Sequence, residues 1–300
     1  MFFKVSLTFF LILNCSFSYA YGLNEKLIKK IAEGELEVLD SKSFSDERKL
    51  FDSLVLFFTG EKNNLNENFF IENLKKKADI NNPEASYLVG MHLLSSSPSF
   101  DTGPGIIKYL ITAAESGIVD AKTALAWIYS TGFITELDPS KAFYWYRLAA
   151  EDGDLEASYQ LGLLYNSGYG TEKNHQEAFK WLKKAAISNY SPAQYVIGLM
   201  YSVGRGTDQN FDEAYTWYFQ SAQSGNVKAL MNLGLMYLTG KGTNKDIVQA
   251  HKFLTISEIL DYQDAKQNRL IIENEMSDDQ IAESLKEVTQ WFRKKREGDI

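Results

Sequence analysis

The sequence repeats every 36 residues without a gap, and this period restricts the fold more than any other feature. Alanines recur at this spacing from Ala85 to Ala265. Four other columns keep the same register over five units, with a small residue five positions after each alanine and mostly Tyr at eight. Ala or Ile stands at twenty-one and an aromatic residue at twenty-four. A period of this length indicates an array of small supersecondary units, each packed on its neighbours.

Each unit has the pattern of two helices. In the unit that begins at Ala157, the residues Ala157, Leu161 and Tyr165 are four apart and share one helical face. Gly168 then ends the helix, and the segment 175–186 carries a second apolar stripe. A residue suited to left-handed backbone follows each second helix. These residues are Gly117, Gly153, Asn189 and Gly225.

Three turns share a Gly-x-Gly-Thr motif, which raises the question of a phosphate site. The third copy reads Gly240-Lys241-Gly242-Thr243. A phosphate-binding P-loop needs four residues between its glycines and a Lys directly before Ser or Thr. Here five residues separate Gly234 from Gly240, Gly242 separates Lys241 from Thr243, and a helical segment precedes the motif. We therefore interpret these stretches as turns between helices and predict neither a nucleotide nor any other cofactor.

The pattern A-x-x-x-L-G-x-x-Y-x-x-G-x-G, continued by A-x-x-W-x-x-x-A-A, resembles the Sel-one-like (SLR) repeat family, which is related to the tetratricopeptide repeats. Residues 157–192 match nearly every position of this pattern, and residues 193–228 almost as many. The resemblance implies an all-α fold: an α/α solenoid of about five to seven 36-residue helix-turn-helix repeats that forms a right-handed superhelix.

The period also predicts the domain organisation. The stretch 21–84 is expected to be an N-terminal helical cap, in which 49–84 is either a degenerate repeat or an unrelated helical pair. The stretch 265–300 is expected to form C-terminal capping helices, and Met276–Ser284 resembles the closing segment of the family. The five full repeats are 85–120, 121–156, 157–192, 193–228 and 229–264.

Residues 1–20 have the pattern of a secretory signal peptide. Lys4 precedes the apolar run 5–13, and Ser18 and Ala20 occupy the −3 and −1 positions of a small-x-small cleavage site. The run is shorter than the ~20 residues that a membrane span requires. An uncleaved first helix and lipid attachment at Cys15 are the alternatives. We predict an exported protein, periplasmic or secreted, whose mature chain has no integral membrane span.

Charge and composition exclude several classes of function. The net charge of −8 argues against nucleic acid as a partner, because such binders need a basic face. The histidines His92, His175 and His251 lack metal-ligand spacing, so they are expected at the surface or between helices. After cleavage no cysteine remains, and the chain contains no Ser-x-x-Lys tetrad. We therefore predict no metal site and no catalytic residues.

The resemblance implies a non-enzymatic protein–protein interaction scaffold or adaptor of the bacterial cell envelope, or a secreted one. First helices line the concave side of such solenoids. Side chains three, seven and ten residues after each repeat alanine are therefore candidates for contacts with a partner protein or peptide, although Ile128 and Leu164 are expected to pack between repeats. The candidate binding residues are Gln160, Ser167, Met200, Val203, Asn232, Met236 and Thr239. The alternative is an envelope enzyme acting on peptidoglycan or β-lactams, similar to a β-lactamase.

Overall fold

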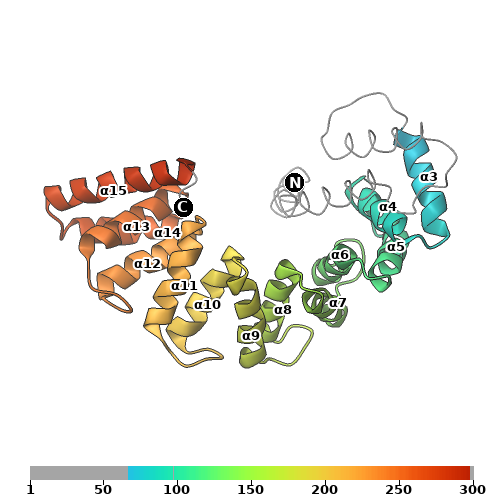
Figure 1. Ribbon diagram of the computed structural model, residues 1–300, viewed down its shortest axis with the longest axis horizontal. Coiled ribbons are helices and arrows are strands. Elements are labelled where there is room, and N and C mark those ends of the chain that lie inside the picture. Colours follow the sequence, from blue (N-terminus) through green and yellow to red (C-terminus); the bar gives the residue numbers. More distant parts are fainter. Residues whose placement is uncertain (1–66, 97, 298–300) are drawn as a thin grey trace. The chain divides into compact units, whose positions relative to one another are not determined.

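The computed structural model describes residues 67–96 and 98–297, in which every regular element is an α-helix (Figure 1). The predicted all-α repeat solenoid is therefore confirmed. The helices are α3 (Glu67–Asp79), α4 (Pro83–Ser96), α5 (Gly103–Glu115), α6 (Val119–Thr131), α7 (Pro139–Glu151), α8 (Leu155–Ser167), α9 (His175–Ile187), α10 (Ser191–Val203), α11 (Phe211–Gln223), α12 (Val227–Thr239), α13 (Ile247–Ile259), α14 (Gln263–Glu273) and α15 (Asp278–Glu297).

The chain divides into two compact units, 1–85 and 86–300. In the first unit, α3 buries Leu74 and Ala78. Asn81 follows α3 with a left-handed φ of 63°. Leu74 and Asn81 stand where the 36-residue period places Leu182 and Asn189, which agrees with a degenerate repeat at 49–84. That repeat stays a prediction, because its first half lies outside the described residues, as do the signal peptide and Cys15.

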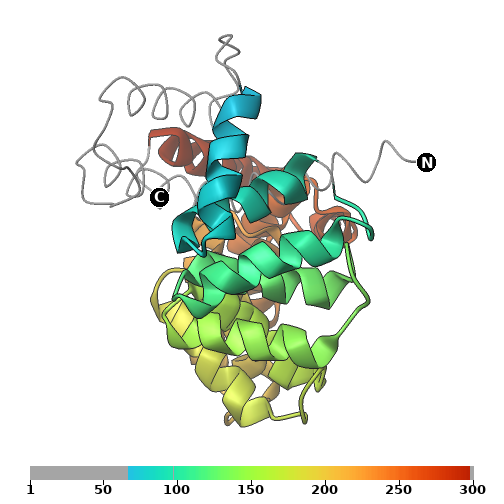
Figure 2. The ribbon, with the colours of Figure 1, turned by 90° about the vertical axis from the view of Figure 1, so that its right-hand side faces the viewer.

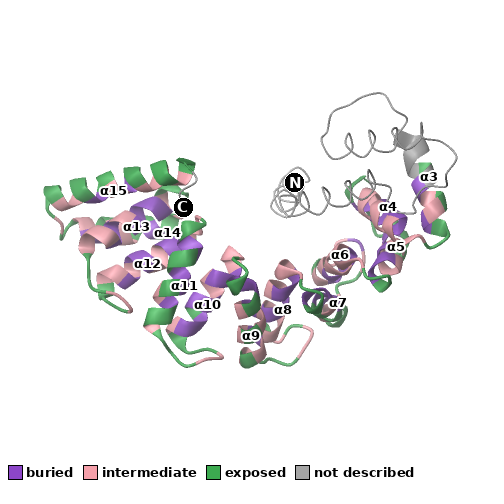
Figure 3. Cartoon of the chain, viewed as in Figure 1, coloured by how far each residue is buried: buried purple, intermediate pink, exposed green. Residues whose placement is uncertain are grey.

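The second unit is built from helix pairs that follow one another in chain order. Each helix from α5 to α13 has 13 residues, so the 36-residue period is kept in the structure. The pairs α6–α7, α8–α9, α10–α11 and α12–α13 pack internally, and each also packs against the next pair (Figures 1 and 2). Buried residues form stripes on these helices, while other sides stay exposed (Figure 3).

Glycine in the middle of a first helix lets the two helices of a pair come close together. A Cβ added at Gly162 in α8 would lie 2.5 Å from Cγ of Leu182 and 3.1 Å from the carbonyl oxygen of Ala178, both in α9. Leu182 is fully buried and has no open space to move into. Gly234 meets Leu254 in the same way, at 2.7 Å. The column of small residues five positions after each alanine is therefore a packing column.

The Gly-x-Gly turns are also packing contacts. Gly168 ends α8 with a left-handed φ of 76°, and its N–H donates to the carbonyl of Leu164 at 2.8 Å. A Cβ at Gly170 would lie 2.0 Å from the carbonyl oxygen of Pro139, the first residue of α7 in the preceding repeat. The next turn repeats this contact, with Gly206 against His175 at 2.1 Å. The second glycine thus lets one repeat's turn press against the preceding repeat's second helix.

The last helix of the array, α15, has 20 residues and packs on α13. A capping box starts it: the N–H of Gln280 donates to Oγ of Ser277 at 3.3 Å, and the N–H of Ser277 donates to Oε1 of Gln280 at 2.9 Å. Asp278 and Asp279 occupy the first turn, where the helix dipole favours negative charge. This end of the helix is therefore fixed locally.

The glycine packing predicts opposite effects for one substitution at two helical positions. We expect Gly162→Ala to destabilise the fold by about 1 to 3 kcal/mol, because the added methyl group overlaps Leu182. Gly105→Ala in α5 is the matched control, since a Cβ there meets nothing within 4 Å. That change should stabilise by about 0.5 to 1 kcal/mol. Urea denaturation measures both, and equal stability of the two variants would contradict the packing role of Gly162.

Candidate functional site

The predicted binding residues fall into three environments. Ser167, Val203 and Thr239, ten residues after a repeat alanine, are exposed at the ends of first helices. Gln160 and Asn232, three residues after an alanine, are half-buried. The methionines seven residues after an alanine are buried: Met200 is 3% exposed and Met236 is 7% exposed. The first two groups are therefore accessible to a partner, whereas the two methionines are not.

The assignment of Met200 and Met236 to a binding groove is wrong. Seven residues are nearly two turns of an α-helix, so this row returns to the side that carries the buried alanines. Cε of Met200 lies 3.2 Å from the place of a Cβ on Gly206, and Met236 meets Gly242 in the same way, at 2.8 Å. Both methionines thus cover the turn of their own repeat. Ile128 in the same row is fully buried, as the packing interpretation predicted.

Four rows on the open side of the first helices stand two, three, six and ten positions after each alanine. We call this surface the first-helix face. All sixteen members in α6, α8, α10 and α12 are half-buried or exposed. The rows at two and six are not among those that the spacing predicted. The members are Thr123, Ala124, Trp127, Thr131, Tyr159, Gln160, Leu163, Ser167, Tyr195, Val196, Leu199, Val203, Met231, Asn232, Leu235 and Thr239.

The first-helix face carries no charged residue among these sixteen, although Asp, Glu, Lys and Arg make up 23% of the chain. In α8 the only charged residue is Glu156 in the first turn, and α10 has none. By contrast, α9 carries Lys180, Lys183 and Lys184. Depletion of charge with retention of aromatic and aliphatic side chains is typical of the centre of protein–protein interfaces.

The polar members of this face differ in what they can offer a partner. Tyr218 of α11, beside this face, has its pKa raised to about 12 by burial, and its hydrogen bonds with Ser202 and Asn232 act against this shift. Asn232 also hydrogen-bonds Tyr195, so its amide is already engaged within the chain. Oγ1 of Thr239 donates to its own helix, to the carbonyl of Leu235 at 2.8 Å.

Gln160 is the polar candidate with the most freedom to bind. Its half-buried amide has no hydrogen-bond partner among residues 67–96 and 98–297. The neighbouring Tyr159 packs on Tyr190 with ring centroids 5.5 Å apart. Burial raises the pKa of Tyr159, so this hydroxyl stays protonated and can donate a hydrogen bond.

One polar cluster has the residue types of a hydrolase relay but not its accessibility. In α13, Nδ1 of His251 lies 2.8 Å from Oγ of Ser284, and Nε2 lies 2.9 Å from Oε1 of Glu273. A nucleophilic serine must reach its substrate. Both His251 and Ser284 are fully buried, so this cluster joins α13 to α14 and α15 instead. His251 therefore lies between helices, one of the two locations predicted.

The carboxylate of Glu273 and one further carboxylate, that of Glu287, hold the same C-terminal helices together. Hydrogen bonding by His251, assisted by the Arg269 guanidinium, lowers the pKa of Glu273 despite its partial burial. Burial acts to raise the pKa of Glu287, but hydrogen bonds from Lys252 and Gln249 outweigh it and lower the pKa. Nζ of Lys252 lies 2.8 Å from Oε2 of Glu287, which links α13 to α15. These pairs orient the cap on the last repeat.

Other kinds of site find no support in the described part of the chain. No group of three or more His, Cys, Asp or Glu side chains there could hold a metal ion. Within the same residues, no helix combines the length and apolar character that crossing a membrane would require.

Removal of the buried histidine tests its structural role. We expect His251→Ala to destabilise the fold by about 2 to 4 kcal/mol, because it leaves a cavity and unpaired polar groups at Ser284 and Glu273. His175→Ala is the matched control, since His175 is half-buried with one hydrogen bond, to Asn166 at 3.0 Å. It should cost less than about 1.5 kcal/mol. Thermal unfolding and hydrogen exchange in α15 measure the effect, and faster exchange in α15 is expected only for His251→Ala.

The lowered pKa of Glu273 predicts a loss of stability in acid. A carboxyl whose pKa is lowered by folding stabilises the fold above its ordinary value of 4.5, and this contribution disappears as the pH falls through the folded pKa. We therefore expect Glu273→Gln to lower stability at pH 7 and to reduce the loss of stability between about pH 5 and pH 3. Glu275→Gln, an exposed change nearby, should keep the slope of the unaltered chain. Equal slopes for all three chains would contradict the role of Glu273.

The comparisons with known proteins agree with the repeat geometry. The family model described as Sel1 repeat matches residues 119–154, 155–190, 191–226 and 227–257. These segments begin two residues before our units from Ala121 onward, and the unit 85–120 stays a prediction. No curated protein matches the chain.

Two solved structures are similar to the chain. One is a protective antigen present in uropathogenic Escherichia coli strains that displays an SLR fold, at 22% identity and a TM-score of 0.70, over 91% of this chain. This chain spans 56% of that antigen. The other is a Sel1 repeat protein from Oxalobacter formigenes, at 30% identity and a TM-score of 0.56, over 61% of this chain and 74% of that one. From its four matched repeats and these structures, the chain belongs to the Sel1 repeat family.

Proposed function

We propose that this chain is a non-enzymatic scaffold or adaptor that binds a partner protein or peptide on the first-helix face. The observation that carries the proposal is the absence of charge from sixteen accessible positions on four consecutive first helices. A folded chain keeps such a surface free of charge at a cost in solubility, so a partner that covers it is the simplest physical reason. We expect this face on the concave side of the solenoid, which first helices line in such arrays.

The family supports the same class of function. Sel1 repeat proteins generally mediate protein–protein interactions, and no catalytic family is indicated for this chain. A row of aliphatic and aromatic side chains with amides beside it suits an extended or amphipathic peptide. The alternative of an envelope enzyme acting on peptidoglycan or β-lactams gains nothing from the described residues, because the Ser284–His251–Glu273 cluster is closed to substrate.

The proposed location is outside the cytoplasm, in the periplasm or as a secreted protein of a bacterium. This part of the proposal rests on the signal-peptide pattern of residues 1–20, which lie outside the described residues. An exported scaffold without cysteine in its mature chain would depend on packing alone, as the glycine contacts between repeats allow.

Site-specific photo-crosslinking in the native cell tests the face. A photoreactive residue at Val203, which is 52% exposed, should yield a discrete adduct with one partner. The matched control is Ile187 at the end of the second helix α9, which is 64% exposed and should not yield that adduct. The double change Leu199→Glu with Val203→Glu should reduce the captured partner about tenfold, because it places charge in an apolar interface.

The charge-introducing variant needs a control of equal chemistry. Ile187→Glu with Ile271→Glu places two carboxylates at exposed apolar positions away from the first-helix face, and we expect capture to stay unchanged. Circular dichroism should show the same helix content for both double variants. The same adduct from Val203 and Ile187, or unchanged capture by the Leu199/Val203 variant, would refute the proposed face.

A further inference from the structure

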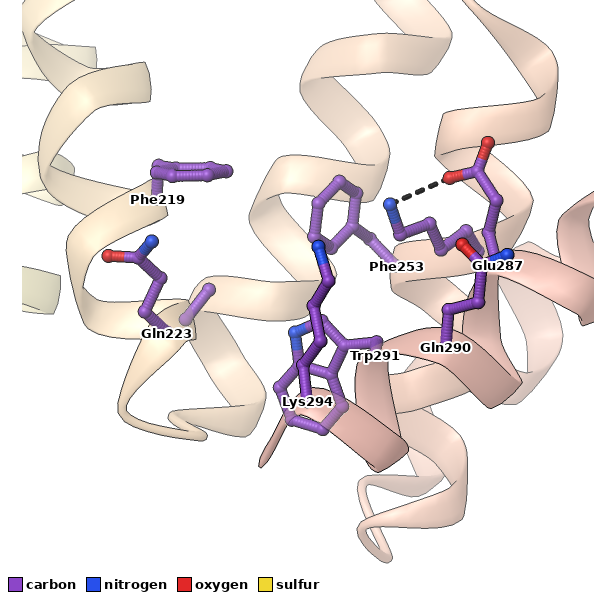
Figure 4. A pocket seen from close by; sticks show the side chains of 9 residues that line it. Phe219, Gln223, Phe253, Glu287, Gln290, Trp291 and Lys294 are labelled. Atoms are coloured by element: carbon purple, nitrogen blue, oxygen red, sulfur yellow. Dashed lines mark hydrogen bonds and ion pairs between the residues drawn. The ribbon is translucent and has the colours of Figure 1, made fainter. Parts of the chain in front are cut away.

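A pocket lies where the cap helix α15 meets the second helices α11 and α13 (Figure 4). We call it the cap pocket. Its aromatic walls are Phe219, Phe253 and Trp291, and its volume is about 150 Å³. The pocket shares no residue with the first-helix face. Its remaining lining residues are Ala222, Gln223, Lys252, Glu287, Gln290 and Lys294.

The volume of the cap pocket determines what can enter it. Pockets for whole metabolites and drug-sized ligands measure about 300 to 1,000 Å³, whereas a cavity of about 150 Å³ holds one benzene ring. Phe219 is 38% exposed at the rim, while Phe253 is 5% exposed at the base. The pocket is therefore suited to a single aromatic or branched aliphatic side chain that enters from solvent.

The two cations of the cap pocket are in different electrostatic states. Lys252 is neutralised by Glu287, the pair that Figure 4 marks with a dashed line. Lys294 is exposed and has no ion pair or hydrogen bond within residues 67–96 and 98–297. A carboxylate next to the entering side chain would complement this ammonium group, since the other positive charge at the pocket is already compensated.

The walls of the cap pocket are held in place before any ligand arrives. Nζ of Lys295 donates to the carbonyl of Gln223 at 2.7 Å, which ties the end of α15 to the end of α11. Nε2 of Gln249 lies 3.0 and 2.9 Å from the two carboxylate oxygens of Glu287, which ties α13 to the middle of α15. A preformed pocket loses less entropy when it binds a side chain.

We propose that the cap pocket is a second docking site, which anchors one aromatic or branched aliphatic side chain of a partner peptide while an adjacent carboxylate pairs with Lys294. The carboxylate is either the peptide's C-terminus or the side chain of a neighbouring Asp or Glu. This site lies on second helices and the cap, so it is independent of the first-helix face. A partner would then be recognised by a short acidic and apolar motif at the cap pocket, in addition to any contacts on the first-helix face.

Three peptides, two pentapeptides and one hexapeptide, serve as probes of this site. All three are N-acetylated: the first is Gly-Ser-Gly-Ser-Phe with a free C-terminus, the second is the same peptide amidated and therefore neutral, and the third is amidated Gly-Ser-Gly-Ser-Glu-Phe. Titration into the full chain is followed by nuclear magnetic resonance of the Trp291 indole N–H, assigned with Trp291→Phe. At least one carboxylate-bearing peptide should bind about fivefold or more tightly than the neutral amide, and which one does so identifies the source of the carboxylate.

Matched variants separate the pocket from general attraction to a basic helix end. Lys294→Glu should abolish the preference for carboxylate peptides, whereas Arg296→Glu, an equal charge change on an exposed residue outside the pocket, should preserve it. Phe219→Ala should weaken binding of the preferred peptide about threefold or more. Tyr169→Ala is its control, because Tyr169 is also 38% exposed but lies in a distant turn.

The outcomes are decisive in either direction. The proposal is overturned if neither carboxylate peptide binds more tightly than the neutral amide, or if Arg296→Glu weakens binding as much as Lys294→Glu. It is equally overturned if Phe219→Ala and Tyr169→Ala have the same effect. Since none of these changes touches the first-helix face, failure here would leave capture at Val203 unaffected, and the two proposals can fail separately.

Discussion

The contact on which this structure depends is the approach of one backbone to another at glycine. Inside a pair, Gly162 lets the buried side chain of Leu182 pack where a Cβ would be. Between pairs, Gly170 lets a turn press on the carbonyl of Pro139 in the preceding repeat. Both contacts join nearest neighbours, as the stability of a solenoid requires. A Cβ at Gly162 or Gly170 would overlap these neighbours, so both glycines are required for the packing seen in their repeat.

This packing also determines which surface remains for binding. The first helices turn their alanine, leucine and glycine columns towards the second helices, and Met200 and Met236 cover their own turns from the same side. The rows at two, three, six and ten positions after each alanine are left open on α6, α8, α10 and α12, and the charged residues Asp120, Glu156 and Lys228 stand one position before an alanine, in the first turn of their helices. The second helix α9 carries Lys180, Lys183 and Lys184, whereas the first-helix face has no charged residue. The sixteen positions of the first-helix face are therefore open and uncharged, whereas a second helix such as α9 is charged.

The sequence predicts the repeat architecture well because its signals are local and repeated. Asn189 takes a left-handed φ of 62°, as its column predicts, and the glycines end their helices as expected. The prediction that Met200 and Met236 bind a partner is wrong because a spacing of seven residues is almost two helical turns, which returns these side chains to the buried stripe. The partners of His251 stand 22 and 33 residues away, at distances that no periodic pattern encodes. The cap pocket escaped prediction for the same reason, since α15 has no equivalent among the repeats.

At the C-terminal end, two capping helices cover the surface that the last repeat would otherwise expose. The last pair, α12–α13, has no following repeat to cover it, so α14 and the longer α15 replace one. Repeat-to-repeat contacts combine glycine and apolar columns with hydrogen bonds such as that of Lys184 Nζ to the carbonyl of Ala150, at 2.8 Å. The cap buries Val288 and adds two polar links of its own, the His251 cluster and the Lys252–Glu287 pair. Polar links define orientation more narrowly than apolar contacts, because they act only at hydrogen-bond distance. A helix of different length held in one orientation leaves a recess where its side chains do not match those of a repeat. The cap pocket lies in this recess. Because the repeat helices have no equivalent of α15, we expect one site of this kind in the array.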